Sequence, residues 1–138
     1  MSALEDRIAI EDLVSRLGLC LDGRRYDALG SVFTADAVGV FPGITFQGLA
    51  EIEAHARRNL PQYERIQHVI SNVLVEPGGD DRARVSANLV ATHVHPGGDP
   101  RKHFQTGCTY RFEVVRAADG WRIARVELDV VWVVGEPV

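Results

Sequence analysis

The spacing of apolar residues changes from a helical period to alternation about halfway along the chain, near Pro61. Before this point, apolar residues recur every three or four positions, as they do on the buried face of an amphipathic helix. This pattern predicts three helices, over residues 3–22, 25–33 and 48–60. Gly23 follows the first of them directly, and glycine is common at the position where a helix ends.

After Pro61, apolar and polar residues alternate, which is typical of strands with one buried face. Four long strands are predicted, over residues 64–76, 82–95, 103–116 and 121–134. Turns rich in Gly, Pro and Asp join them, so we expect consecutive antiparallel hairpins. A short hairpin is predicted at 37–41 and 44–46. The fold class is therefore α+β: a curled antiparallel sheet of four long strands plus a short hairpin, wrapped by three N-terminal helices.

Length and charge narrow the possible functions. The 138 residues suit a single domain, residues 1–138, with one core. The net charge is −4 and no basic face outweighs the acids, which argues against nucleic acid or acidic membranes as partners. Without an export signal or a long apolar run, we expect a cytoplasmic protein that does not span a membrane. Cys20 and Cys108 have no redox or metal-binding spacing, so we expect buried free thiols.

Asp22, at the end of the first helix, is the first candidate for chemistry. A carboxylate there faces the negative end of the helix dipole, at a cost of a few tenths to about 1 kcal/mol. A histidine is its natural partner, because a carboxylate that fixes one imidazole tautomer makes a proton-transfer base near neutral pH. His68 and His93 lie on the predicted strands. Helical periodicity alone does not decide whether the Asp22 side chain points inward, because Asp22 lies roughly 100° from the apolar stripe of its helix.

Alternation predicts the walls of a pocket around these histidines. His68, Ile70 and Asn72 share one face of the first long strand, and His93 stands among small residues on the second. The third and fourth strands add side chains for a flat, mostly apolar ligand: Cys108, Tyr110 and Trp132.

Simpler interpretations remain open at this level. An inward histidine on a strand is often only a hydrogen-bonded core residue. A metal site at His93, His95 and His103 is an alternative, although no carboxylate has a useful spacing. His55, beside two arginines, is expected to be solvated. No motif for nucleotide binding or serine hydrolysis is present, and no cofactor is predicted.

Three segments together resemble the SnoaL-like group of the nuclear-transport-factor-2-like superfamily: LCLDGRRYDALGSVFTADAV (19–38), QHVISNVLVE (67–76) and TYRFEVVRAADGWRIARVEL (109–128). The resemblance implies a cone-shaped fold with an internal ligand pocket. Its members include scytalone dehydratase, polyketide cyclases, ketosteroid isomerase and a dehydrochlorinase. In the dehydratase and dehydrochlorinase branch, an Asp at the end of the first helix pairs with a His on the first long strand, and these positions match Asp22 and His68. The dehydratase's second His matches His93.

The chain also departs from these relatives. Leu21 and Phe41 stand where scytalone dehydratase has tyrosines that polarise its substrate. The oxyanion-hole residues of ketosteroid isomerase have no match here, so scytalone and the chemistry of ketosteroid isomerase are not expected for this chain. The dehydrochlorinase has a lysine one turn before its Asp, where this chain has Leu17 or Gly18. A cation that could stabilise chloride is therefore missing, unless Arg111 or Arg125 enters the pocket.

These observations predict a cofactor-independent lyase or isomerase for a small cyclic or polyketide-like substrate. His68 is expected to abstract a proton with Asp22 behind it, His93 to act as the acid, and Asn72 to orient a substrate oxygen. The pocket walls are assigned to Leu17, Phe41, Ile70, Cys108, Tyr110 and Trp132. The alternative is a non-catalytic binding or assembly module on the same fold.

Oligomerisation is expected in either case, because outward-facing valines need covering: Val69, Val73, Val75, Val90 and Val94. The resemblance implies a homodimer or homotrimer formed through that face.

Overall fold

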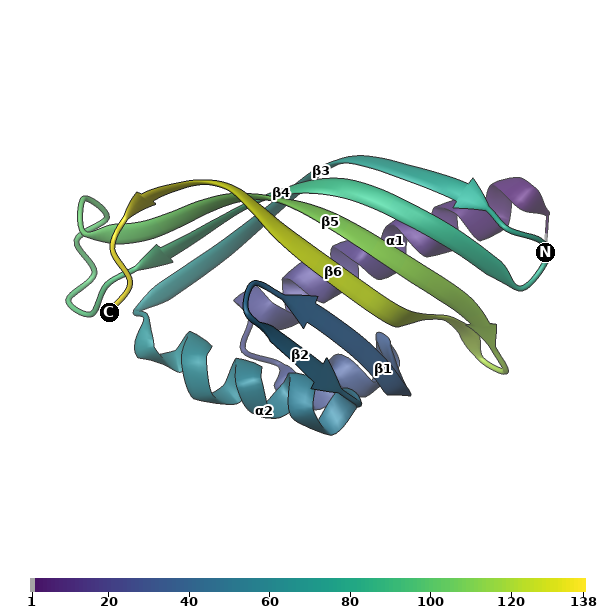
Figure 1. Ribbon diagram of the computed structural model, residues 1–138, viewed down its shortest axis with the longest axis horizontal. Coiled ribbons are helices and arrows are strands. Elements are labelled where there is room, and N and C mark those ends of the chain that lie inside the picture. The colour runs from purple at the N-terminus through teal and green to yellow at the C-terminus, as the bar shows by residue number, and fades with distance from the viewer. Residues whose placement is uncertain (1) are drawn as a thin grey trace.

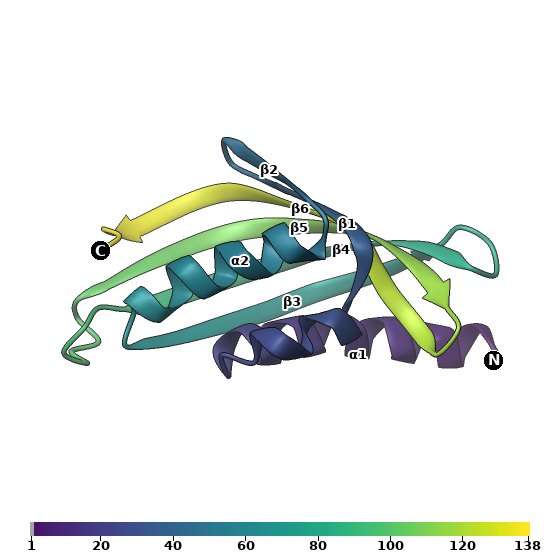
Figure 2. The same cartoon turned by 90° about the horizontal axis from the view of Figure 1, so that it is seen from below.

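The computed structural model describes residues 2–138 as one long curled sheet with its helices gathered on one side (Figure 1). The sheet has six strands in the order β2-β1-β6-β5-β4-β3. The strands are β1 (Phe33–Phe41), β2 (Ile44–Gln47), β3 (Arg65–Pro77), β4 (Arg82–Val94), β5 (His103–Ala117) and β6 (Gly120–Gly135). The helical elements are α1 (Ala3–Asp22), the 3-10 helix η1 (Tyr26–Ser31), α2 (Leu49–Asn59) and the 3-10 helix η2 (Leu60–Gln62). Seen from below, α1 lies along β3 (Figure 2).

The α+β class and the curled sheet are confirmed, but three details that involve the N-terminal half differ from the prediction. The second helix is only the short η1, and β1 begins at Phe33 rather than at residue 37. β1 pairs parallel to β6, so the sheet is mixed. The Ile123 N–H donates to the Val32 carbonyl (2.8 Å), so the chain is hydrogen-bonded to β6 directly after η1 and does not continue as a helix. None of the helices within residues 2–138 is long and apolar enough to cross a membrane.

One face of α1 fills the core, and a neighbouring face lies close to β3. The core-facing stripe of α1 is buried and includes Ile10, Leu13, Val14 and Leu17. On the other face, a Cβ added to Gly18 would lie 3.3 Å from Ile70 Cδ1, so little space separates helix and strand at this point. Both cysteines are free and buried, as expected.

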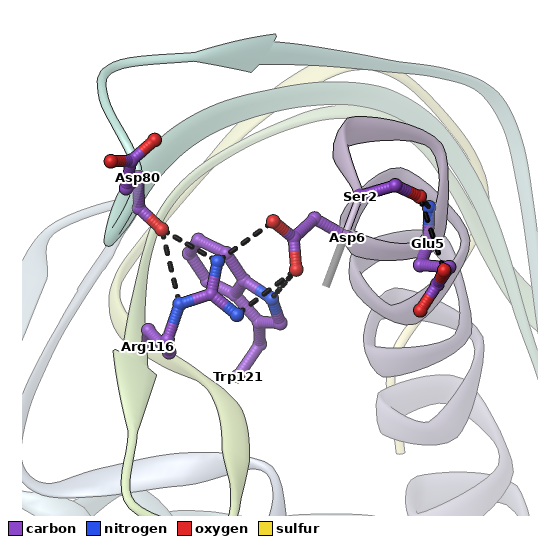
Figure 3. A network of polar contacts seen from close by, with 6 residues as sticks. All are labelled: Ser2, Glu5, Asp6, Asp80, Arg116 and Trp121. Carbon is purple, nitrogen blue, oxygen red and sulfur yellow. Dashed lines mark hydrogen bonds and ion pairs between the residues drawn. The ribbon is translucent and has the colours of Figure 1, made fainter.

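A polar clamp holds the N-terminal end of α1 against the sheet (Figure 3). The Arg116 guanidinium donates to both carboxylate oxygens of Asp6 at 3.0 and 2.7 Å, and the Trp121 indole N–H donates to Asp6 at 3.2 Å. Arg116 also reaches the Asp80 carbonyl in the β3–β4 turn. These hydrogen bonds to Arg116 lower the pKa of Asp6. The clamp therefore connects α1, the β3–β4 turn and the β5–β6 hairpin.

A bulge in β3 breaks the predicted alternation. Asn72 has a positive φ of 55°, and the register with β4 shifts between Ser71 and Leu74. The side chains beyond it change faces, so Leu74 is 50% exposed and Val75 only 8%. The prediction that Asn72 shares the inward face of His68 is therefore wrong, and so is the outward placement of Val75.

A second bulge lies in β6. Cys108 pairs with Val130 but Gly107 pairs with Trp132, so the strand carries one extra residue, and Trp132 lies on the face opposite Cys108. A Cβ on Gly107 would collide with the Trp132 ring. Trp132, which is 41% exposed, therefore covers Gly107 rather than lining the interior as predicted.

We expect Gly107→Ala to destabilise the protein by about 1–3 kcal/mol, because the added methyl group must displace the indole. Trp132→Ala in the same chain should recover part of this loss, since it removes the obstacle. The free energy of unfolding in urea measures both effects. Gly30→Ala is the control, because its nearest neighbouring atom lies 3.7 Å away. Strictly additive effects of the two substitutions would contradict the packing.

Candidate active site

A cavity of about 140 Å³ lies between the helices and the inner face of the sheet. Most of its wall is apolar and comes from α1, η1, β1, β2, α2, η2 and β6. Four side chains with polar groups also line it: His55, Asn59, His68 and Tyr110. A largely apolar space with a few polar groups suits a small organic ligand.

His68, one of the side chains that line this cavity, forms a close pair with Asp22. The His68 Nδ1 lies 2.6 Å from Asp22 Oδ1, with the two side chains 7% and 23% exposed. An ionised carboxylate only accepts hydrogen bonds, so Nδ1 carries the ring proton and Nε2 carries the lone pair. Nε2 makes no hydrogen bond with any other group of residues 2–138. The pair therefore presents a basic nitrogen from a residue in the cavity wall.

The backbone explains why Asp22 turns toward this strand. The His68 amide N–H donates to both Asp22 oxygens, at 2.9 and 3.1 Å. β3 is an edge strand of the sheet, so this N–H has no neighbouring strand to pair with. Asp22 therefore satisfies an edge amide and the ring N–H at the same time. These hydrogen bonds offset the cost of placing a carboxylate at the negative end of the helix dipole.

His93 lies beside the dyad, with its ring centroid 6.2 Å from that of His68. It does not line the cavity. Its Nδ1 is 3.2 Å from the Phe104 carbonyl, which only accepts, so Nδ1 carries the proton and Nε2 is an acceptor. Burial lowers the pKa of His93. These features do not favour the predicted role of His93 as the acid.

The predicted wall residues fall into three groups. Leu17, Phe41 and Tyr110 line the cavity. Ile70 and Cys108 lie outside that wall, Ile70 against Gly18 and Cys108 in the core. Asn72, in the β3 bulge, is exposed, and Trp132, which follows the β6 bulge, is 41% exposed.

His55 was expected to be solvated, and this prediction is wrong. It is half-buried and lines the cavity from α2. Its ring packs 4.5 Å, centre to centre, from that of Phe46, and its Nδ1 lies 3.0 Å from the Asn59 amide nitrogen. The signal was its spacing of three residues after the buried Ile52, which the neighbouring arginines obscured.

The alternative metal site is not assembled within residues 2–138, where no three potential ligands converge. His93, His95 and His103 contact three different carbonyls: those of Phe104, Glu136 and Pro100.

The chain belongs to the family of SnoaL-like domains, whose pattern matches residues 2–127. An uncharacterised protein of Mycobacterium tuberculosis is 30% identical over 135 residues, which span 91% of this chain and 85% of the relative. The terrestric acid biosynthesis cluster protein E of Penicillium crustosum is 29% identical, over 97% of this chain and 88% of its own length. A crystal structure of a hexachlorocyclohexane dehydrochlorinase from Novosphingobium barchaimii has a TM-score of 0.83 at 20% identity, covering 98% of this chain and 91% of that one.

The lowered pKa of His93 predicts how stability depends on pH. Its ordinary value is 6.5, and the unfolded chain takes up a proton more readily than the folded one. The neutral His93 therefore makes its full contribution to the free energy of unfolding above pH 6.5. This contribution is lost as the pH falls below 6.5, because the unfolded chain then binds the proton more tightly. We expect His93→Gln to flatten the decline in unfolding free energy between pH 7 and 5, measured by urea denaturation. His103→Gln, at the start of β5, is the control. An unchanged slope in His93→Gln would show that His93 is not protected from protonation.

Proposed function

We propose that the protein is a cofactor-independent lyase or isomerase that abstracts a proton from a carbon atom of a small, mostly apolar cyclic substrate. The observation that carries this proposal is the 2.6 Å contact between Asp22 and Nδ1 of His68, whose side chain lines an apolar cavity. His68 Nε2 takes the proton, and the electron pair of the broken C–H bond remains on the substrate as an enolate. Loss of a leaving group then gives elimination, and return of the proton to another carbon gives isomerisation.

Asp22 serves this step in two ways. It fixes the tautomer in which Nε2 is the free base, and its negative charge stabilises the imidazolium that forms. General-base assistance of this kind is typically worth about 10²–10⁴ in rate. The surrounding apolar wall limits competition from water. The attraction between the Asp22 carboxylate and the His68 imidazolium is therefore stronger than it would be in water.

The cavity restricts the size of the substrate. Its 140 Å³ is below the roughly 300–1,000 Å³ of sites that hold drug-sized ligands, so one or two small rings are the appropriate scale. The relative from a Penicillium biosynthesis cluster supports a natural-product substrate.

A non-catalytic binding module is the second candidate. It is favoured by Leu21 and Phe41, which line the cavity but offer no hydroxyl to polarise a bound carbonyl. Under this proposal, the cavity binds a cyclic molecule and catalyses no reaction of it.

Deuterium exchange separates the two candidates. We expect the protein in D₂O to exchange α-protons of some members of a panel of one- and two-ring ketones, as followed by NMR. Asp22→Asn and His68→Gln should each slow exchange by about 10²–10⁴, because each removes part of the base. His103→Gln is the control and should keep the parental rate. Binding of the ketones without exchange in the parent protein would favour the binding module.

We also propose a homodimer or homotrimer. The second half of β6 carries a run of exposed apolar residues, with Val131 67% and Val133 52% exposed, and Val69 on β3 is 52% exposed. Burial of such a run by another copy of the chain removes it from water.

Sedimentation velocity tests this assembly. We expect the parent protein to sediment as a dimer or trimer and Val131→Glu to move toward the monomer, because a buried charge opposes association. Leu19→Glu is the control, since Leu19 is 70% exposed on α1. A parent protein that is monomeric at all concentrations would contradict the proposal.

A further inference from the structure

We propose that His55 is a second functional histidine of the cavity, which donates an Nε2–H hydrogen bond to a carbonyl oxygen of the substrate while His68 removes a proton from the neighbouring carbon. This inference rests on the proposed function and narrows its substrate class to cyclic ketones and their enols. Asn59 is the positioning residue that sets the His55 tautomer.

The orientation of the Asn59 amide is fixed by the backbone. Its nitrogen lies 2.9 Å from the His55 carbonyl oxygen and 3.0 Å from His55 Nδ1. A carbonyl oxygen only accepts, so the amide atom that faces it must be the NH₂ group. The opposite orientation would place two acceptor oxygens against each other. The second hydrogen of the same NH₂ group is thus directed to Nδ1.

This contact defines the His55 tautomer. Nδ1 accepts from Asn59 and therefore carries no proton, which leaves the proton of the neutral ring on Nε2. Burial and the nearby Arg58 charge lower the pKa of His55, so the ring stays neutral. Nε2 makes no hydrogen bond within residues 2–138. His55 thus holds a donor without a protein partner, in a side chain that lines the cavity.

His55 and His68 offer complementary chemistry in the same cavity. His68 is held by a carboxylate and presents a lone pair, whereas His55 is held by an amide and presents a proton. The two side chains come from different elements, β3 and α2. A ketone whose α-carbon meets His68 and whose oxygen meets His55 develops its enolate charge beside a fixed donor. A neutral imidazole in this role stabilises charge as it forms, without the cost of burying a cation.

The aromatic packing keeps this donor in position. The His55 ring lies 4.5 Å from that of Phe46 and 6.2 Å from that of Phe41, between ring centroids. Phe41 and Leu21 supply no donor in this part of the wall. Tyr110 is the competing donor, because it lines the cavity and burial raises the pKa of its hydroxyl, which keeps the proton on oxygen.

The probe for the experiment is cyclohex-2-enone labelled with ¹³C at the carbonyl. A hydrogen bond from His55 should shift the bound carbonyl resonance downfield, and His55→Leu should return it toward the value of the free ketone. His55→Gln, which restores an N–H donor, should recover part of the shift. Tyr110→Phe is the matched comparison and should leave most of the shift in place. A full shift in His55→Leu, or its loss in Tyr110→Phe alone, would overturn the assignment.

The role of Asn59 has its own measurement. Long-range ¹H–¹⁵N spectra of the parent protein should show His55 protonated at Nε2, and Asn59→Leu should give a mixture of tautomers. A change in packing alone would not move this equilibrium. Observation of an Nδ1–H tautomer in the parent would contradict the proposal.

Exchange rates distinguish failure of this inference from failure of the proposed function. We expect His55→Leu to slow α-proton exchange by about 10²–10³, the usual effect of removing one such donor. If His68→Gln abolishes exchange and His55→Leu does not slow it, the base assignment stands and the His55 assignment falls. If the parent shows no exchange with any ketone, the lyase proposal falls, and the carbonyl shift still decides whether His55 binds the oxygen.

Discussion

The Asp22 carboxylate is the constraint on which the candidate site depends. It accepts from the backbone amide and from the ring of the same residue, His68, at 2.9 and 2.6 Å. The end of α1 and the edge of the sheet are thereby held in one geometry. The close approach at Gly18, one turn earlier, makes this possible, because a larger side chain there would crowd Ile70. The same carboxylate therefore satisfies the backbone N–H of His68 and fixes the tautomer in which the His68 ring can act as a base.

Three histidines show how the partner of Nδ1 decides what an imidazole can do. A carboxylate holds His68, a backbone carbonyl holds His93, and a side-chain amide holds His55. The first two keep the proton on Nδ1, and the third places it on Nε2. Burial lowers the pKa of both His55 and His93, which favours their neutral forms. The same residue type thus provides different chemistry within a short distance.

The sequence was sufficient for the class of fold, the four long strands and the hairpin order, because alternation and turn residues are local signals. It was insufficient wherever one extra residue in a strand moved the following side chains to the other face of the sheet. The bulge at Asn72 and the extra residue before Trp132 are set by pairing with neighbouring strands, which no local pattern records. The parallel pairing of β1 with β6 depends likewise on contacts between distant segments. His55 lines the cavity because it lies three residues after the buried Ile52 on α2, although the two arginines that follow it in the sequence are exposed.

The chain contains two tryptophans in contrasting environments. Trp121 is 5% exposed and belongs to the clamp with Asp6 and Arg116, whereas Trp132 is 41% exposed beside Gly107. Their fluorescence therefore reports on different events. Emission from Trp121 follows the docking of α1 on the sheet, and emission from Trp132 responds to what covers the outer end of β6. With one of the two replaced by phenylalanine, unfolding and self-association become separately visible in the same optical measurement.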